Sequence, residues 1–127
     1  MLPDPEANKR TVLAFYEDAV NRRDSAAAER LLGPVYIQHR SDAADGADGL
    51  REFIGRMRAR HPHSHTEIKQ VFADGDHVIL HVHVVREPGQ RGSAHVDIFR
   101  LDQGKIVEHW DVDAPIPATS AHSNGPF

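Results

Sequence analysis

The chain has 127 residues, no cysteine and a formal net charge of −4, with 15 lysines and arginines against 19 aspartates and glutamates. This length indicates one domain over residues 1–127, whose core buries enough surface to fold without disulfides or a structural metal. The lack of cysteine excludes thiolate nucleophiles and cysteine-based zinc sites, and the scattered basic residues argue against a nucleic-acid partner. Because the N-terminus is polar and no apolar run has membrane-spanning length, we expect a cytoplasmic protein with no membrane partner.

The first half of the chain is predicted to form three helices and one short strand. Asp4 followed by Pro5 is typical of a helix N-terminus, and apolar residues then recur at helical spacing. Asp24 and Asp48 are expected to cap the second and third helices, because an aspartate there accepts hydrogen bonds from free backbone N–H groups. The expected ranges are 5–22, 24–32 and 48–60 for the helices and 35–39 for the strand.

The second half of the chain is predicted to be an antiparallel meander of four strands. From Thr66 onward apolar residues alternate with a period of two, and short turns rich in Asp and Gly interrupt the pattern. Short turns join antiparallel neighbours. The expected strands are 66–73, 77–85, 93–101 and 105–113. After Asp113 the chain is rich in Pro, Ser and Ala, which predicts an extended C-terminal arm over residues 114–127.

Histidine is the unusual component of this sequence, with ten copies in the chain. Histidine titrates near neutral pH, so its placement bears directly on function. The last three strands each carry two titratable residues at a spacing of two, which puts both on one face of the strand. These pairs are His81 and His83, His95 and Asp97, and His109 and Asp111. We expect all three pairs to share one face of three adjacent strands.

The turn over residues 102–104 predicts how the last two strands pair. A three-residue hairpin loop with Gly104 in the left-handed position places Asp97 opposite His109 and His95 opposite Asp111. A carboxylate beside an imidazole orients it and raises its basicity, so such a couple can take a proton from carbon and return it elsewhere. A slip of one residue would remove this geometry.

Three other interpretations fit the same pattern. An antiparallel sheet with one solvated face also alternates in this way, with its apolar face packed on the helices. A metal enzyme is a second alternative, in which Asp97 and several imidazoles bind zinc, iron or copper. The imidazoles concerned are those of His81, His83, His95 and His109. A third alternative is a non-catalytic module that binds a small apolar molecule.

Three stretches of the chain resemble the SnoaL-like polyketide cyclases and their predicted aldol-condensation relatives, in the nuclear transport factor 2-like superfamily. They are YIQH at 36–39, ADGDHVILHVHV at 73–84 and HVDIFRLDQGKIVEHWDVD at 95–113, and the resemblance spans about residues 6 to 117. It implies an α+β fold in which a cone-shaped, curved antiparallel β-sheet packs on three N-terminal helices around a deep pocket. It also implies a homodimer formed through the sheet.

The resemblance further implies an enzyme that needs no cofactor and no metal. We expect it to act on a small carbonyl-containing, polyketide-like molecule by aldol-type cyclisation, isomerisation or dehydration. Asp97 or Asp111 is the expected base, with His109 and His95 as partners. The residues expected to line the pocket and bind substrate are His39, His81, His83, Phe15, Tyr16, Phe53 and Phe99.

The parity of the predicted strand 35–39 leaves one of these assignments open. His39 ends this strand, while Tyr36 and Gln38 occupy its opposite face and compete with His39 for the interior. The sequence therefore allows His39 to lie either at the pocket rim or on the protein surface.

Overall fold

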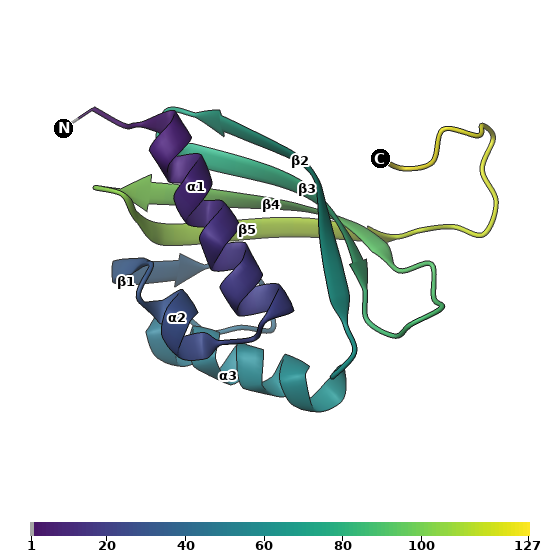
Figure 1. Ribbon diagram of the computed structural model, residues 1–127, viewed down its shortest axis with the longest axis horizontal. Helices are drawn as coiled ribbons and strands as arrows, with labels where there is room; N and C mark the ends of the chain where they lie inside the picture. The colour runs from purple at the N-terminus through teal and green to yellow at the C-terminus, as the bar shows by residue number, and fades with distance from the viewer. Residues whose placement is uncertain (1) are drawn as a thin grey trace.

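A computed structural model describes residues 2–127 (Figure 1). Its helical part comprises α1 (Pro5–Tyr16), the π-helical segment η1 (Glu17–Asn21), α2 (Ser25–Glu29) and α3 (Gly46–Arg60). Its strands are β1 (Leu32–Gln38), β2 (His65–Asp74), β3 (His77–Val85), β4 (Ser93–Asp102) and β5 (Lys105–Pro115). The predicted α+β class with three N-terminal helices and a curved sheet is confirmed.

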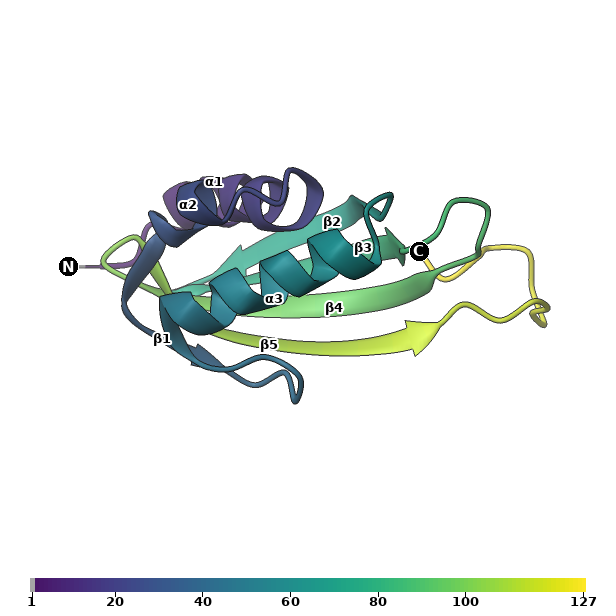
Figure 2. The ribbon, with the colours of Figure 1, turned by 90° about the horizontal axis from the view of Figure 1, so that it is seen from below.

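All five strands form one sheet in the order β1-β5-β4-β3-β2. Strands β2 to β5 are an antiparallel meander, as expected, whereas β1 joins the edge in parallel and pairs Gln38 with His109. Figure 1 shows α1 lying across the sheet, and Figure 2 shows the curvature of the strands beneath the helices. The inner face of the sheet, which meets the helices, therefore combines strands from both ends of the chain.

The core lies between α1 and the inner face of the sheet. The even-numbered side chains of β3 are apolar and buried, with Leu80 and Val82 fully excluded from solvent. They pack in one cluster with Val12 and Phe15 of α1. Burial of a Leu or Phe side chain contributes about 1.5–3 kcal/mol, so this contact decides which face of β3 points inward.

The inward orientation of the even-numbered residues of β3 contradicts the prediction that His81 and His83 share a face with Asp97. Even residues of β3 pair with odd residues of β4, as Leu80 does with Asp97, so His81 and His83 lie on the outer face. The connection over residues 86–92 is long enough to allow either parity, and burying valine rather than imidazole selects this one. His81 and His83 therefore do not line the interior as expected.

The hairpin between β4 and β5 differs from the predicted three-residue loop. Gln103 and Gly104 alone form the turn, with φ of 51° and 79°, and Asp102 pairs directly with Lys105. Such a two-residue turn suits the twist of a hairpin. A β-bulge at Val107 then adds one residue to β5. Beyond the bulge the same side chains face inward as predicted, but each residue of β4 pairs with a residue of β5 two positions later than predicted.

The bulge also explains a glycine in β1. The predicted second helix was to run to Leu32 and end at Gly33, but β1 already begins at Leu32. A Cβ on Gly33 would lie 2.7 Å from Cγ1 of Val107, so a side chain at this position would force Val107 to move. In α3, Asp45 precedes the helix and Asp48 lies in its first turn rather than at the cap.

The outer face of the sheet carries exposed apolar side chains, among them Phe72 and Val112. Residues 116–127 follow β5 without helix or strand, and Phe127 packs against the rings of His81 and His83 at centroid distances of 5.1 and 5.0 Å. The homodimer through this face stays a prediction. Within residues 2–127, none of the helices combines the length and the apolar character that crossing a membrane requires.

Candidate active site

A cavity of about 120 Å³ lies between the helices and the inner face of the sheet. It is large enough for several water molecules or part of a small organic molecule, and its walls are mostly apolar with a few polar groups, as in small-molecule sites. The predicted aromatic residues Phe15, Tyr16, Phe53 and Phe99 all line it. The predicted acid–base residues Asp97, Asp111, His95 and His109 line it as well.

His39 lies outside this cavity. Its imidazole is exposed, stacks on Trp110 at a centroid distance of 4.9 Å and contacts Glu108 at 2.8 Å, both on the outer face. Tyr36 and Gln38 occupy the interior instead, because β1 pairs with β5 through Gln38 and His109. His39 therefore does not line the cavity, contrary to the expectation.

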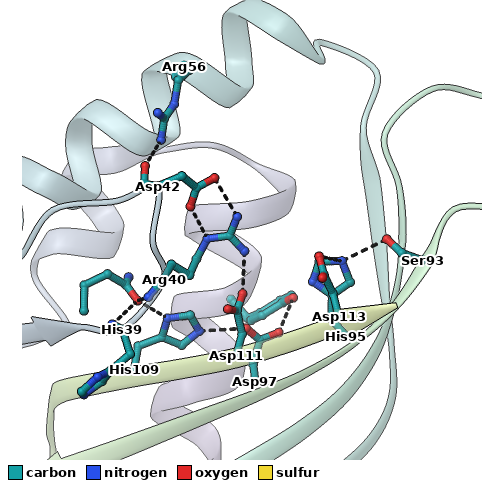
Figure 3. A network of polar contacts seen from close by, with 12 residues as sticks. His39, Arg40, Asp42, Arg56, Ser93, His95, Asp97, His109, Asp111 and Asp113 are labelled. Carbon is teal, nitrogen blue, oxygen red and sulfur yellow. Dashed lines mark hydrogen bonds and ion pairs between the residues drawn. The ribbon is translucent and has the colours of Figure 1, made fainter. Parts of the chain in front are cut away.

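Asp97 and His109 form a buried pair in the wall of the cavity, and Figure 3 shows the contact between them. Oδ1 of Asp97 lies 2.8 Å from Nε2 of His109, and Tyr16 donates its hydroxyl hydrogen to Oδ2 of Asp97 at 3.0 Å. The shifted register puts Phe99, not Asp97, directly opposite His109, so the contact is diagonal across the two strands. The predicted couple thus forms through long side chains rather than through direct pairing.

The hydrogen bonds around Gln38 indicate which atoms of the Asp97–His109 pair carry a hydrogen. Oε1 of Gln38 accepts the backbone N–H groups of His39 and Arg40 at 2.9 and 3.0 Å, so the amide orientation is determined. The same oxygen lies 2.9 Å from Nδ1 of His109, which must therefore carry a hydrogen. At 2.8 Å, Nε2 and the Asp97 oxygen then share one further proton, either as imidazolium and carboxylate or as two neutral groups.

Asp111 does not pair with His95, as the predicted register required, but with Arg40. Nη1 of Arg40 donates to Oδ2 of Asp111 at 2.5 Å, and the same guanidinium donates two hydrogen bonds to Asp42. Burial acts to lower the pKa of Arg40, but the hydrogen bonds to Asp42 and Asp111 outweigh it and raise that pKa. Arg40 is thus a permanent cation that neutralises Asp111, directly opposite Asp97 in the sheet.

Arg40 was not predicted as a site residue, and Gln38 was predicted only as a competitor of His39. Gln38 at the end of β1 and Arg40 just beyond it continue the spacing of two from Tyr36, so the usual alternation of a strand was the available signal. Alternation alone does not show which face of β1 points inward. The parallel pairing of β1 with β5 decides this.

His95 lies at one end of the cavity, away from the central pair. Its Nε2 lies 3.0 Å from Oγ of Ser93 and 3.5 Å from a carboxylate oxygen of Asp113, its partner across the hairpin. Burial lowers the pKa of His95, and the nearby carboxylates of Asp97 and Asp113 only partly oppose this. The imidazole is therefore mainly neutral at pH 7.

The lowered pKa of His95 predicts a dependence of stability on pH. Between the folded pKa and the unfolded value of about 6.5, the unfolded chain binds more protons, so stability falls as the pH drops through this interval. We expect His95→Gln to flatten the curve of melting temperature against pH in this range, whereas the exposed control His63→Gln leaves it unchanged. An NMR titration in which the His95 ring protonates above pH 6.5 would contradict this assignment.

A metal has one candidate location among the described residues. Asp97, His109 and Asp111 offer ligand atoms that all lie within 4.8 Å of one another. A cation there would compete with the Arg40 guanidinium and with the proton between Asp97 and His109. The set expected from sequence does not assemble, because His81 and His83 lie on the outer face. The geometry favours acid–base chemistry over metal binding.

Comparison with known proteins identifies the family of this chain. The model of the SnoaL-like domain matches residues 12–109, most of the chain. The chain therefore belongs to the SnoaL-like domain family, in the nuclear transport factor 2-like superfamily, and the resemblance stated above is confirmed.

Individual relatives agree with this assignment. "Probable cyclase otaY" of Aspergillus carbonarius is 29% identical over 110 residues, which cover 83% of this chain and 87% of the relative. An LEH-like epoxide hydrolase from M. tuberculosis superposes with a TM-score of 0.69 at 22% identity, covering 88% of this chain and 86% of the other. A cystatin-fold protein from Novosphingobium aromaticivorans reaches 0.71 at 21% identity, with 83% and 97% covered. At these identities the two structures establish the fold alone.

Proposed function

We propose that this protein is a cofactor-free acid–base enzyme that acts on a small carbonyl-containing, polyketide-like substrate. Its reaction is an aldol-type cyclisation, an isomerisation or a dehydration, and Asp97 and His109 transfer the proton. The 2.8 Å contact between Oδ1 of Asp97 and Nε2 of His109, both buried, is the observation that carries the proposal. The family supports it, since a relative is named a cyclase.

In the proposed first step, the Asp97 carboxylate accepts a proton from the carbon next to a substrate carbonyl. The C–H bond breaks, an O–H bond forms on Asp97, and the electron pair moves to the carbonyl oxygen to give an enolate. The Tyr16 hydroxyl and Nε2–H of His109 donate to the Asp97 carboxylate before this step. Once Asp97 is protonated and neutral, these two donors can turn to the enolate oxygen and stabilise its new negative charge. Burial and the neighbouring Asp97 raise the pKa of Tyr16, so its hydroxyl keeps its hydrogen as a donor.

The enolate carbon then attacks a second carbonyl of the same molecule, or takes a proton at another position. The former closes a ring and the latter moves a double bond. His109 returns the proton, which Asp97 restores to it at the end of the cycle. Asp111 acts through Arg40, since this ion pair fixes charge and position beside Asp97.

Exchange of carbon-bound hydrogen for deuterium tests this function without knowledge of the product. A panel of cyclic ketones and β-keto esters that includes 1-indanone is incubated in D2O, and exchange is followed by proton NMR. We expect at least one member to exchange faster than in buffer alone, at a rate that treatment with EDTA leaves unchanged. If no member exchanges above the buffer rate, the proposal is wrong; loss of exchange with EDTA would favour the metal enzyme.

Gln38 provides a test of the proton arrangement itself. Gln38→Met removes the acceptor of the Nδ1–H group, so we expect His109 to move its hydrogen to Nε2 and the exchange rate to fall about 10–100-fold, as for other residues that orient a functional histidine. Gln38→Glu keeps an acceptor oxygen and is expected to keep the tautomer. The exposed Gln70→Met serves as the control.

The tautomer of His109 is read directly from the nitrogen chemical shifts of its ring. An unchanged pattern of Nδ1 and Nε2 shifts in Gln38→Met would contradict the assigned role of Gln38, whatever the rate of exchange.

A further inference from the structure

A buried hydroxyl in the cavity wall has no hydrogen-bond partner. Thr66, near the start of β2, is only 2% exposed, and its Oγ1 has no partner among the residues that the structure describes. Thr66 pairs with Val84 of β3, and both side chains line the cavity. Its Oγ1 has almost no accessible surface, so a group in the cavity can accept from it only after the side chain rotates about χ1. Since an unpaired buried hydroxyl costs free energy and native proteins rarely retain one, a polar ligand in the cavity would favour that rotation.

Two arginines lie at the same end of the cavity. Arg86 comes directly after β3 and lines the cavity, and Arg23 reaches it from the segment after η1. Arg23 is held in place by hydrogen bonds to the backbone oxygens of Pro62 at 2.9 Å and Ser64 at 2.7 Å. Figure 1 shows the start of β2 beside the end of β3, the two segments that Thr66 and Val84 join.

The charges of the cavity wall are unusual for an acidic chain. Three arginines and two aspartates line it, although the whole chain has a formal net charge of −4. Arg40 is neutralised by Asp111 and Asp42. Among the residues described, neither Arg23 nor Arg86 makes an ion pair with a carboxylate, so this end of the cavity keeps an excess positive charge.

We propose that Thr66, Arg86 and Arg23 form a subsite for a carboxylate of the substrate. The hydroxyl of Thr66 donates one hydrogen bond to the carboxylate, and the guanidinium of Arg86 supplies the opposite charge. We therefore infer a substrate that is a small, mostly apolar carbonyl compound with a carboxylate. The carboxylate follows from this subsite, whereas the carbonyl group rests on the proposed function. His95, being neutral, lies between this subsite and Asp97 without competing for the anion.

The register of the sheet indicates how far the two ends of such a substrate are apart. Asp97 of β4 pairs with Leu80 and Thr66 of β2 pairs with Val84, which are four residues apart on β3, or roughly 13 Å along the strand. Since β4 and β2 are also two strand spacings apart, roughly 10 Å, the two backbone positions are roughly 16 Å apart. Long arginine side chains shorten this span. We therefore expect an elongated molecule whose carboxylate lies beyond one ring from its reactive carbon.

Binding of a simple acid and its uncharged amide tests the subsite independently of catalysis. The probes are 3-phenylpropanoate and 3-phenylpropanamide, titrated against the whole chain and followed by the Thr66 methyl and backbone amide NMR signals. We expect the acid to bind at least about tenfold more tightly than the amide, as for a hydrogen bond to a charged group. Equal affinities, or shifts confined to Arg40 and His109, would overturn the proposal.

Three variants of the subsite and one exposed control assign the effect to its residues. Arg86→Gln and Thr66→Val are expected to lose most of the preference for the acid, while Thr66→Ser retains it and the exposed Arg58→Gln behaves as the native chain. Thr66→Val also removes the unpaired hydroxyl, so its melting temperature is expected to rise although binding weakens. An unchanged preference in Arg86→Gln would refute the subsite. A chain that binds the acid as expected but catalyses no exchange would instead refute only the proposed function.

Discussion

Replacing Asp97 by asparagine is expected to lower the rate of hydrogen–deuterium exchange by about 10²–10⁴-fold, the contribution typical of a positioned acid or base. The amide of the variant can still accept the hydroxyl of Tyr16, which now donates to Oδ2 of Asp97 at 3.0 Å. It can also donate to Nε2 of His109. The side chain therefore keeps its place, but no carboxylate remains to take a proton from carbon. The exchange assay described above measures the loss.

The matched control for this variant is Asp102→Asn at the other end of β4, where the side chain is exposed. We expect its rate to equal that of the native chain. Circular dichroism and the melting temperature establish that both variants are folded. If Asp97→Asn retains the native rate while folded, Asp97 is not the base.

Replacing His109 by glutamine is expected to cost a similar factor, about 10²–10⁴ in rate, because the pair then lacks the group that returns the proton. Glutamine can still donate a hydrogen bond to Asp97. The change therefore removes the titratable nitrogen but keeps a contact with Asp97. The two residues share one proton and act as a unit, and effects within such a unit are strongly non-additive. The double variant with Asp97→Asn is therefore expected to be about as slow as either single variant.

His81→Gln is the control for this experiment, since His81 lies on the outer face of the sheet. Its rate is expected to be unchanged. Losses that multiply in the double variant would show that Asp97 and His109 act independently, contrary to the shared proton inferred from Gln38.

Local signals in the sequence were sufficient for most of the secondary structure. Asp4 and Asp24 cap their helices through hydrogen bonds to backbone N–H groups at 3.1 Å, as expected from residue type alone. Strand β3 has the predicted bounds, and the other strands of the meander differ by one or two residues. These features depend on neighbours in sequence, which is why the sequence determines them.

The errors concern contacts between distant segments. His81 and His83 were placed with Asp97 because all are titratable, yet the apolar side chains at the even positions of β3 settle its orientation by burial. His39 was placed inside because the pairing of β1 with β5 was unknown. Neither parity follows from a single strand, since each depends on the partner that the strand packs against.

The acid–base pair itself was predicted for a reason that was only partly right. The expected register placed Asp97 directly opposite His109, and the bulge at Val107 shifted it by two residues. The even shift kept both residues on the same face, and their side chains were long enough to meet diagonally. The predicted couple between His95 and Asp111 does not form, because the same shift places Asp113 opposite His95. Asp111 forms an ion pair with Arg40 instead.

The extra residue at Val107 limits how this hairpin can change in length during evolution. Removing one residue between the turn and Glu108 would turn His109 and Asp111 toward the outside and bring Glu108 and Trp110 into the pocket. Surface hairpins usually accept insertions and deletions, but here only changes of two residues at a time preserve the chemistry. Homologues with a turn of different length should therefore differ from this chain by an even number of residues in this segment.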